Sequence, residues 1–175
     1  MLDTIRLAST EDLDEIWMTL VEVCRQMSHD RYSPQWTLGV YPSKDDVMEA
    51  IAQCSFYVGI LDGRIVATMI VRQRDDDEYA NVPWPSGLSG NEVSTVHLVA
   101  VHPSLRGKGI GAELVREAIR LSRAWSKRAV HLDVMLGNLA ASRIYTAEGF
   151  AYVGNSEAFY EDTGTVELEM YELVL

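Results

Sequence analysis

The chain has 175 residues, 47% of them hydrophobic, and a formal net charge of −11 at pH 7. This length predicts one domain with a single sizeable core, and this composition excludes a disordered chain. The acidic balance argues against nucleic acid as a partner, because binding phosphates needs a basic face. It is compatible with a cationic acceptor such as an amine.

The sequence predicts a cytoplasmic protein without a membrane segment or a metal site. No apolar run is long enough to cross a bilayer. The N-terminal stretch has acidic residues where a secretion signal needs a basic start and a hydrophobic middle. The two cysteines, Cys24 and Cys54, have neither a paired nor a metal-type spacing, so we expect two reduced, buried thiols.

The first part of the chain predicts strands and amphipathic helices separated by clear caps and turns. The expected elements are a strand over 4–8, a helix from the Ser9-Thr10 cap to about residue 28, a loop over 28–40 that contains Tyr32 and Pro34, a helix after the Ser43 cap, and a hairpin of strands 55–61 and 64–72 around Asp62-Gly63.

The second part begins with a long acidic excursion over 73–90, which is of a length that is usually functional or mobile. The elements expected after it are a strand over 93–101, a helix from 110 to about 126, a strand over 129–136, a helix over 139–148 capped by Asn138, and strands over 150–153 and 166–175 joined by a polar loop over 154–165. The strand, helix and strand from 93 to 136 have no hairpin turn, which predicts a parallel crossover.

The glycine-rich turn from Arg106 to Gly111 predicts a cradle for a phosphate group, most naturally a pyrophosphate. A glycine turn that opens a helix exposes unpaired N–H groups, and the helix dipole favours negative charge there. Arg106 and Lys108 add two cations. The turn lacks the lysine-serine pair of nucleotide hydrolases and the glycine spacing of dinucleotide-binding folds. The alternative is an ordinary connection with solvated basic residues.

This turn resembles the acyl-CoA-binding motif of the GNAT family of N-acetyltransferases, which reads Arg or Gln, two residues, Gly, one residue, Gly or Ala. The matching residues are Arg106, Gly109 and Gly111. A second stretch is similar to the family's late motif and supplies Asn138, Ala141, Tyr145, Gly149 and Phe150. The order of expected elements, β-α-α-β-β-β-α-β-α-β-β, extends the resemblance to the whole chain.

The resemblance implies an α/β GNAT fold, with a mixed, mostly antiparallel sheet of about seven strands, about four helices and a splayed parallel strand pair at the acyl-CoA site. It also implies one N-acetyltransferase domain over 1–175, with acetyl-CoA as acyl donor and an amine as acceptor. The residues implied to bind the donor are Val99, Ala100, Val101, Arg106, Gly107, Lys108, Gly109, Ile110, Gly111, Asn138, Ala141 and Tyr145. The amide of Val99 or a near neighbour is implied to polarise the thioester carbonyl.

Tyr145 is the implied proton donor to the leaving thiolate, because a tyrosine with an ordinary pKa near ~10 can supply a proton as the bond breaks. The alternative is a tyrosine packed on the sheet with a solvated hydroxyl.

His97 is the candidate general base, since an attacking amine must lose a proton and histidine titrates near neutrality. Some GNAT members carry a glutamate where this chain has Thr95, so a glutamate base at that point is in doubt. Thr95, His97 and Val99 share one side of the strand if no bulge lies between them. The alternatives are a structural role for His97, a base role for Glu92 through water, or no dedicated base. We expect His102 and His131 to be structural or surface residues.

The acceptor is predicted to be a small amine that receives the acetyl group directly, because no cysteine is placed to form an acyl-enzyme. Aromatic residues beside acidic ones suit a cation; the candidates are Trp36, Tyr41, residues 75–78, Trp84, Phe159 and Tyr160. The alternatives are an acyl-CoA sensor without turnover, or an enzyme acting on protein N-termini or lysines. By analogy with the family, strand 166–175 could pair two copies in a homodimer.

Overall fold

The computed structural model describes the whole chain except residues 28, 31–35 and 161–163. Its contacts divide it into two compact units. The first unit contains Met1–Val71 and Leu98–Leu114, and the second contains Arg72–His97 and Val115–Leu175. The strand Val93–Val101 and the helix Ile110–Ala124 continue from one unit into the other.

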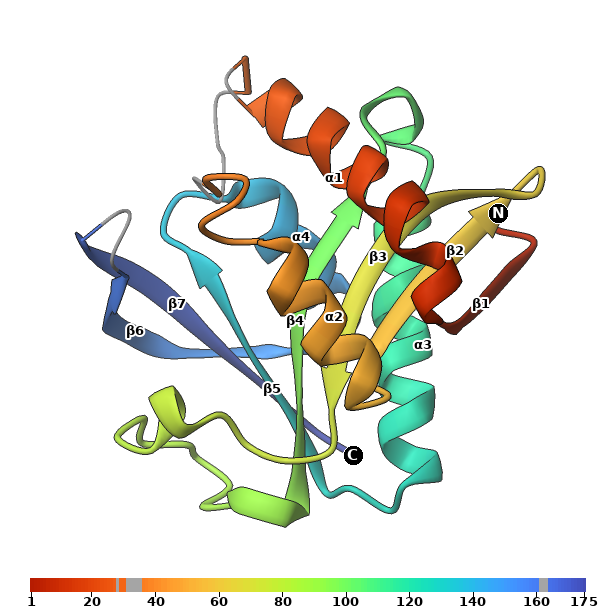
Figure 1. Ribbon diagram of the computed structural model, residues 1–175. Coiled ribbons are helices and arrows are strands. Elements are labelled where there is room, and N and C mark those ends of the chain that lie inside the picture. Colours follow the sequence, from red (N-terminus) through yellow and green to blue (C-terminus); the bar gives the residue numbers. More distant parts are fainter. Residues whose placement is uncertain (28, 31–35, 161–163) are drawn as a thin grey trace. The chain divides into compact units, whose positions relative to one another are not determined.

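The first unit is built on antiparallel strands covered by two helices. Its elements are β1 (Thr4–Leu7), α1 (Leu13–Met27), α2 (Lys44–Ala52), β2 (Phe56–Leu61) and β3 (Arg64–Arg72). Strand β2 pairs with β1 on one side and with β3 on the other. Figure 1 shows α1 and α2 on the same face of these strands. Their apolar faces form one core with residues of β2 and β3, including Ile16, Leu20, Val47, Phe56 and Val58.

Two local signals in this unit confirm the sequence predictions. Ser43 caps α2 in a capping box, because its hydroxyl accepts from the N–H of Asp46 at 3.1 Å while its own N–H donates to the Asp46 carboxylate at 2.8 Å. Asp62 and Gly63 have φ values of +51° and +70°, which is the conformation that a tight two-residue hairpin needs.

The second unit holds the parallel pair that was predicted. The first half of β4 (Val93–Val101) pairs in parallel with β5 (Ala129–Met135), with Thr95 opposite His131. Strand β5 pairs antiparallel with β7 (Gly164–Val174), which pairs with β6 (Ala151–Tyr160). The strand order is β1-β2-β3-β4-β5-β7-β6. With α3 (Ile110–Ala124) and α4 (Leu139–Ala147), the expected element order is confirmed.

Strand β6 is longer than the sequence predicted. We expected a strand ending at Val153 and a polar loop over 154–165, but β6 continues to Tyr160. Gly154 lies at a shift in the β6–β7 register and has a φ of +151°. The glycine therefore marks a bulge rather than the end of the strand. The polar residues that follow alternate in exposure, as they do on a half-solvated strand.

The excursion after β3 is packed onto its own unit rather than being a bare loop. It contains short 3₁₀ turns at Asp77–Tyr79 and Gly90–Glu92. Tyr79 and Trp84 are buried in a small core with Leu168 and Met170 of β7. This packing fixes the acidic residues of the excursion against the polar side chains of β4, β5 and β7.

One expectation about the cysteines is wrong. Both thiols are free, but Cys54 is exposed and Cys24 is partly buried. Cys54 follows α2 in a left-handed conformation, with a φ of +52°, at the turn into β2. No helix among the described residues has the length and apolar character needed to cross a membrane.

Candidate active site

The predicted phosphate cradle of the first unit has the expected backbone. After a 3₁₀ turn at Pro103–Leu105, Gly107 and Gly109 adopt left-handed φ values of +76° and +83°. A Cβ added to either glycine would meet no atom within 4 Å. Helix α3 then begins at the buried Ile110, and the Glu113 N–H donates to the Gly109 carbonyl at 3.1 Å. The N–H groups of the first helical turn therefore have no intrahelical acceptor.

The two cations of the turn differ in their surroundings. Lys108 is exposed to solvent. Arg106 forms an ion pair with Asp30, which follows α1. A guanidinium has five N–H donors, so the contact with Asp30 leaves others for an anion. Open space above two glycines, unpaired helix donors and these cations fit a phosphate group.

Strand β4 contains a break that the sequence prediction assumed to be absent. Leu98 has a φ of +50°, a left-handed value that is uncommon for a residue other than glycine. The assumption that Thr95, His97 and Val99 share one side of an uninterrupted strand is therefore wrong. Val99, Ala100 and Val101 lie after this break, with Ala100 buried and both valines partly exposed.

In the second unit, Asn138 caps α4. Its side-chain oxygen accepts from the N–H of Ala141 at 3.3 Å, which confirms the capping alternative and leaves its amide donors for another partner. Tyr145 is buried, with its ring 5.7 Å from that of Phe150 and 6.4 Å from that of Tyr171.

The expectation of an ordinary pKa for Tyr145 is wrong. Burial, and secondarily the charge of Asp133, raise the pKa of the Tyr145 hydroxyl. The hydroxyl therefore stays protonated throughout the neutral range and is a weaker acid than a solvated tyrosine.

His97 lies between two carboxylates of the same unit. Its Nε2 is 3.3 Å from Oδ2 of Asp76, and its Nδ1 is 3.8 Å from Oδ1 of Asp133. Among the described residues, Nε2 has no well-aligned hydrogen-bond partner although it is buried. The side chains of His97, Asp76 and Asp133 are 15%, 17% and 21% exposed, so solvent reaches all three.

The two carboxylates beside His97 are held differently. Asp76 accepts a hydrogen bond from Arg72 at 2.9 Å and another from the N–H of Glu78 at 3.2 Å. The neighbouring His97 imidazole is the main reason that the pKa of Asp76 is lowered to about 2. Asp133 accepts a hydrogen bond from the Tyr79 hydroxyl. The group around His97 therefore contains two carboxylates, each of which can stabilise a positive charge placed beside it.

His131 is also flanked by carboxylates, but it is closed off from solvent. Its two ring nitrogens lie 3.1 Å from oxygens of Asp75 and Glu172, and its side chain is 0% exposed. The ring of Trp84 stacks on it at 3.7 Å and 12°. Ser86 donates a further hydrogen bond to Glu172 at 2.5 Å. These contacts fit the structural role expected for His131.

The remaining candidates have other partners. Glu92 is paired with Arg128, His102 caps the 3₁₀ turn before the cradle, and the Thr95 hydroxyl donates to the carbonyl of Arg74. Trp36 packs edge-on against Tyr41, and Phe159 is exposed. Tyr32, Pro34 and the side chain of Tyr160 lie outside the described residues.

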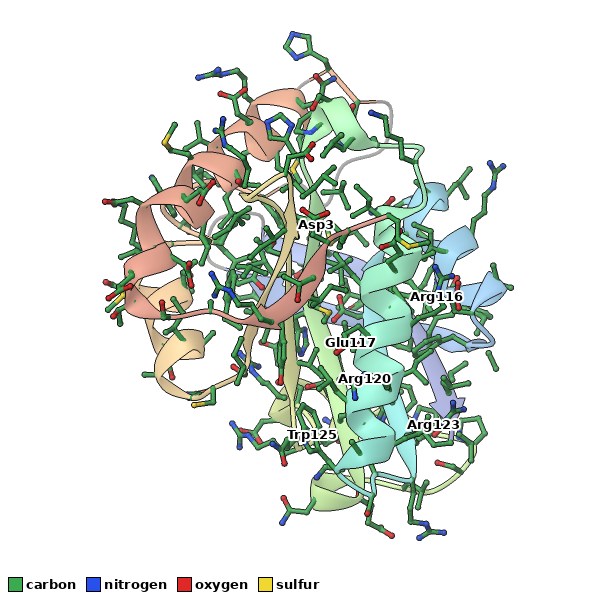
Figure 2. All side chains as sticks on the ribbon, turned by 90° about the vertical axis from the view of Figure 1, so that its right-hand side faces the viewer. Asp3, Arg116, Glu117, Arg120, Arg123 and Trp125 are labelled. Atoms are coloured by element: carbon green, nitrogen blue, oxygen red, sulfur yellow. The ribbon has the colours of Figure 1, made fainter. Side chains whose placement is uncertain are left out.

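The exposed side of α3 carries a row of arginines, which Figure 2 labels. Arg116 is paired with Glu148 at 2.6 Å, and Arg120 is paired with Glu117 at 2.6 Å. Arg123 lies one turn further on and is exposed. Because acidic partners balance the first two charges, this face is not a strongly basic surface of the kind that nucleic acid requires.

Sequence reasoning missed Asp133. The strand Ala129–Met135 is otherwise buried and apolar, and its two polar residues, His131 and Asp133, stand two apart. Successive side chains of a strand alternate between its faces, so these two share a face. A carboxylate on the buried face of a parallel strand was the signal that could have identified it.

Comparison with known proteins gives the fold and the family that the sequence motifs indicated. The model of the acetyltransferase (GNAT) family matches residues 21–150. N-alpha-acetyltransferase RimI of Mycobacterium tuberculosis is 36% identical over 69 residues, which are 39% of this chain and 42% of that protein. The matches cover less than half the length of the first curated relatives.

Solved structures share the fold across the whole chain. A GNAT-family acetyltransferase of Streptococcus agalactiae superposes with a TM-score of 0.81 at 20% identity, covering 100% of this chain and 98% of that one. The yncA protein of Salmonella typhimurium, solved with acetyl-CoA, has a TM-score of 0.71 at 18% identity, covering 98% and 93%. Since the family model spans most of the chain, this protein belongs to the GNAT family of acetyltransferases.

Proposed function

We propose that the chain works as one N-acetyltransferase domain that moves an acetyl group from acetyl-CoA directly to a small-molecule amine. The observation that carries this proposal is the turn at Gly107 and Gly109, where two left-handed glycines leave open space beside the unpaired N–H groups of α3. Family membership and the acetyl-CoA found in the yncA structure support it.

The turn would hold the pyrophosphate of the donor. The backbone donors of residues 107–111 supply hydrogen bonds, and Lys108 and Arg106 supply positive charge. Asn138 and Ala141 of α4, and the backbone of Val99, Ala100 and Val101, are proposed to bind the rest of the donor through the family motifs. Acetyl-CoA supplies the activated acyl group.

His97 and Tyr145 are proposed to move the protons. An acceptor that arrives as an ammonium ion loses one proton to His97, and its lone pair then forms the bond to the acyl carbon. As the carbon–sulfur bond breaks, Tyr145 gives its proton to the sulfur, and the second proton that the nitrogen loses restores the hydroxyl of Tyr145. The raised pKa of Tyr145 keeps this proton in place until the thiolate develops. Nδ1 of His97 lies 3.8 Å from Oδ1 of Asp133, and the charge of the same carboxylate contributes to the raised pKa of Tyr145.

Calorimetry with acetyl-CoA, paired with a glycine substitution, tests the donor site. Gly109→Asp places bulk and negative charge where the pyrophosphate is proposed to lie, and it should weaken acetyl-CoA binding at least a hundredfold. Gly63→Asp is the matched control, because Gly63 has a similar φ of +70° and nothing within 4 Å of an added Cβ. Equal affinity in the two variants would refute the proposed cradle.

A thiol-release assay with an amine panel tests the reaction. Release of CoA that depends on a small amine supports the proposal, and intersecting initial-velocity lines support direct transfer. Release only with peptide N-termini or lysines would assign a protein substrate instead, and acetyl-CoA binding without any release would assign a sensor.

A further inference from the structure

The group around His97 contains more than a base. Five ionisable side chains converge there from four elements: Arg72 from β3, Asp76 and Tyr79 from the excursion, His97 from β4 and Asp133 from β5. Burial, and secondarily the charge of Asp133, raise the pKa of Tyr145 in α4. All of them belong to the second unit, and the carboxylates and imidazole are partly open to solvent.

The two carboxylates of this group differ in whether a permanent cation neutralises their charge. Asp76 is paired with Arg72, a permanent cation, at 2.9 Å. Among the described residues, the recorded partners of Asp133 are the Tyr79 phenol and the His97 imidazole, which carry no permanent charge. Asp133 is therefore the carboxylate whose negative charge remains available to a ligand.

The two sides of the His97 ring also differ. Asp76 lies beside Nε2 at 3.3 Å, where it can take the N–H of the neutral ring and leave Nδ1 as the basic atom. Catalytic hydrogen bonds are often long before the substrate binds, so the imperfect alignment of this contact is compatible with such a role. Nδ1 faces Asp133 across 3.8 Å, which is too long for a direct hydrogen bond.

We infer that Asp133 recognises the acceptor's ammonium group and that Asp76 positions His97 to deprotonate it. The acceptor is accordingly an amine whose ammonium form has at least two N–H donors and that has no negative charge close to its nitrogen. The inference rests on the proposed function and names the substrate class and two further residues of that site. An ammonium has three N–H donors, so one can point to the carboxylate of Asp133 while another points to Nδ1 of His97.

The proton balance of this step is simple. One ammonium N–H bond breaks as its proton passes to Nδ1, and the electron pair stays on nitrogen for the attack on the acyl carbon. The imidazolium that forms lies between Asp76 and Asp133, which stabilise its positive charge. Asp76 acts through His97 and is a positioning residue, whereas Asp133 contacts the acceptor.

Steady-state kinetics with a matched pair of amines test the recognition of the ammonium. The wild-type protein should acetylate n-butylamine at least tenfold more efficiently than norvaline, which is the same chain with a carboxylate added on the carbon that bears the nitrogen. Asp133→Asn, which keeps the shape of the side chain, should raise the KM for n-butylamine at least tenfold and leave acetyl-CoA affinity unchanged. The control is Asp14→Asn on α1, which removes the same charge from a side chain that is 94% exposed.

Asp76→Asn separates positioning from recognition. It should lower kcat about tenfold at neutral pH and leave the KM for n-butylamine unchanged, because the imidazole loses the carboxylate that can hold its Nε2 N–H. A merely structural Asp76 would lower the melting temperature and leave kcat unchanged at a temperature where the variant is folded, and that result would overturn its role.

Titration of the imidazole signals by NMR provides a readout without turnover. Addition of n-butylamine should shift the His97 signals in the wild-type protein and not in Asp133→Asn. An amine-induced shift that is unchanged in Asp133→Asn would overturn the inference. If the wild-type protein bound no acetyl-CoA yet showed the Asp133-dependent shift, the proposed function would fail while ammonium recognition stood.

Discussion

His97 and His131 have similar neighbours but differ in how tightly these neighbours contact the ring and in whether solvent reaches it. Each imidazole lies between one carboxylate from the excursion, Asp76 or Asp75, and one from a strand, Asp133 or Glu172. Around His131 both contacts are 3.1 Å, a tryptophan covers the ring and no surface is exposed. Around His97 the contacts are 3.3 and 3.8 Å, and solvent reaches the ring.

The difference shows how one set of residue types serves structure in one place and chemistry in another. A buried polar group whose bonding capacity is filled rigidifies the fold around it. A partly solvent-exposed group that still has an unpaired hydrogen-bond donor or acceptor can form the missing hydrogen bond with a ligand. His131 thus holds the excursion against β5 and β7, and the open His97 group is the one that we propose to bind the acceptor.

The largest expected effect is that of substituting His131, the histidine that is closed off from solvent. His131→Ala leaves the carboxylates of Asp75 and Glu172 without their shared hydrogen-bond partner, and leaving two buried charged groups unsatisfied costs about 3–5 kcal/mol. The free energy of unfolding, measured with urea, should fall by that amount. The same substitution at His97 should cost much less, because its contacts are longer and partly solvated. A larger loss at His97 than at His131 would reverse the assignment of the two roles.

The next effect concerns rate rather than stability. His97→Gln should lower the turnover of an amine substrate at least about a hundredfold, the lower end of the usual contribution of a positioned base. The dissociation constant for acetyl-CoA, measured by calorimetry, should stay unchanged. Unaltered turnover would favour an enzyme that binds the neutral fraction of the amine without a dedicated base.

A smaller effect follows from the pKa of Asp76, which is lowered to about 2 in the folded protein. A carboxyl whose pKa is lowered by folding stabilises the folded state at pH values above its pKa in the unfolded state, which is near 3.8. This contribution is lost as the pH falls toward 2. Unfolding curves from pH 5 to pH 2 should show the wild-type protein losing about 2 kcal/mol that Asp76→Asn does not lose. Parallel curves for the two proteins would contradict the charge coupling of Asp76 to its neighbours.

The smallest expected effect is that of Tyr145→Phe. Because burial makes the hydroxyl a weak acid, its removal should lower kcat about tenfold, or ~1.4 kcal/mol, with acetyl-CoA affinity preserved. Rapid-quench measurement of the chemical step checks the value. An unchanged rate would leave Tyr145 as a packing residue against Phe150 and Tyr171.

Much of the fold could be predicted from the sequence because its signals are local. The Ser43 cap, the Asp62-Gly63 turn and the glycines before α3 each determine backbone geometry within a few residues. The extent of β6 could not be predicted, because the pairing of its polar residues with β7 depends on a partner strand distant in sequence. The left-handed Leu98 has no local signal at all, since leucine rarely adopts that conformation.

The candidate site was predictable only where a motif names it. The cradle residues and Tyr145 follow from spacing, and His97 follows from its place on the central strand. The partners of His97 do not, because Asp76 and Asp133 are 57 positions apart in sequence and meet only through the packing of the excursion on β5 and β7. The shift in the pKa of Tyr145 depends on its burial and on the charge of Asp133, which are also products of the tertiary structure.

The measurement that tests the account most directly is amine-dependent release of CoA from acetyl-CoA by the wild-type protein, with n-butylamine as acceptor and mass spectrometry of the product. Direct acetyl transfer predicts that CoA and the N-acetylated amine appear together in equal amounts. It also predicts that CoA release falls to the background rate when the amine is omitted. Acetyl-CoA binding with no amine-dependent release, from this amine or any other in a panel, would contradict it.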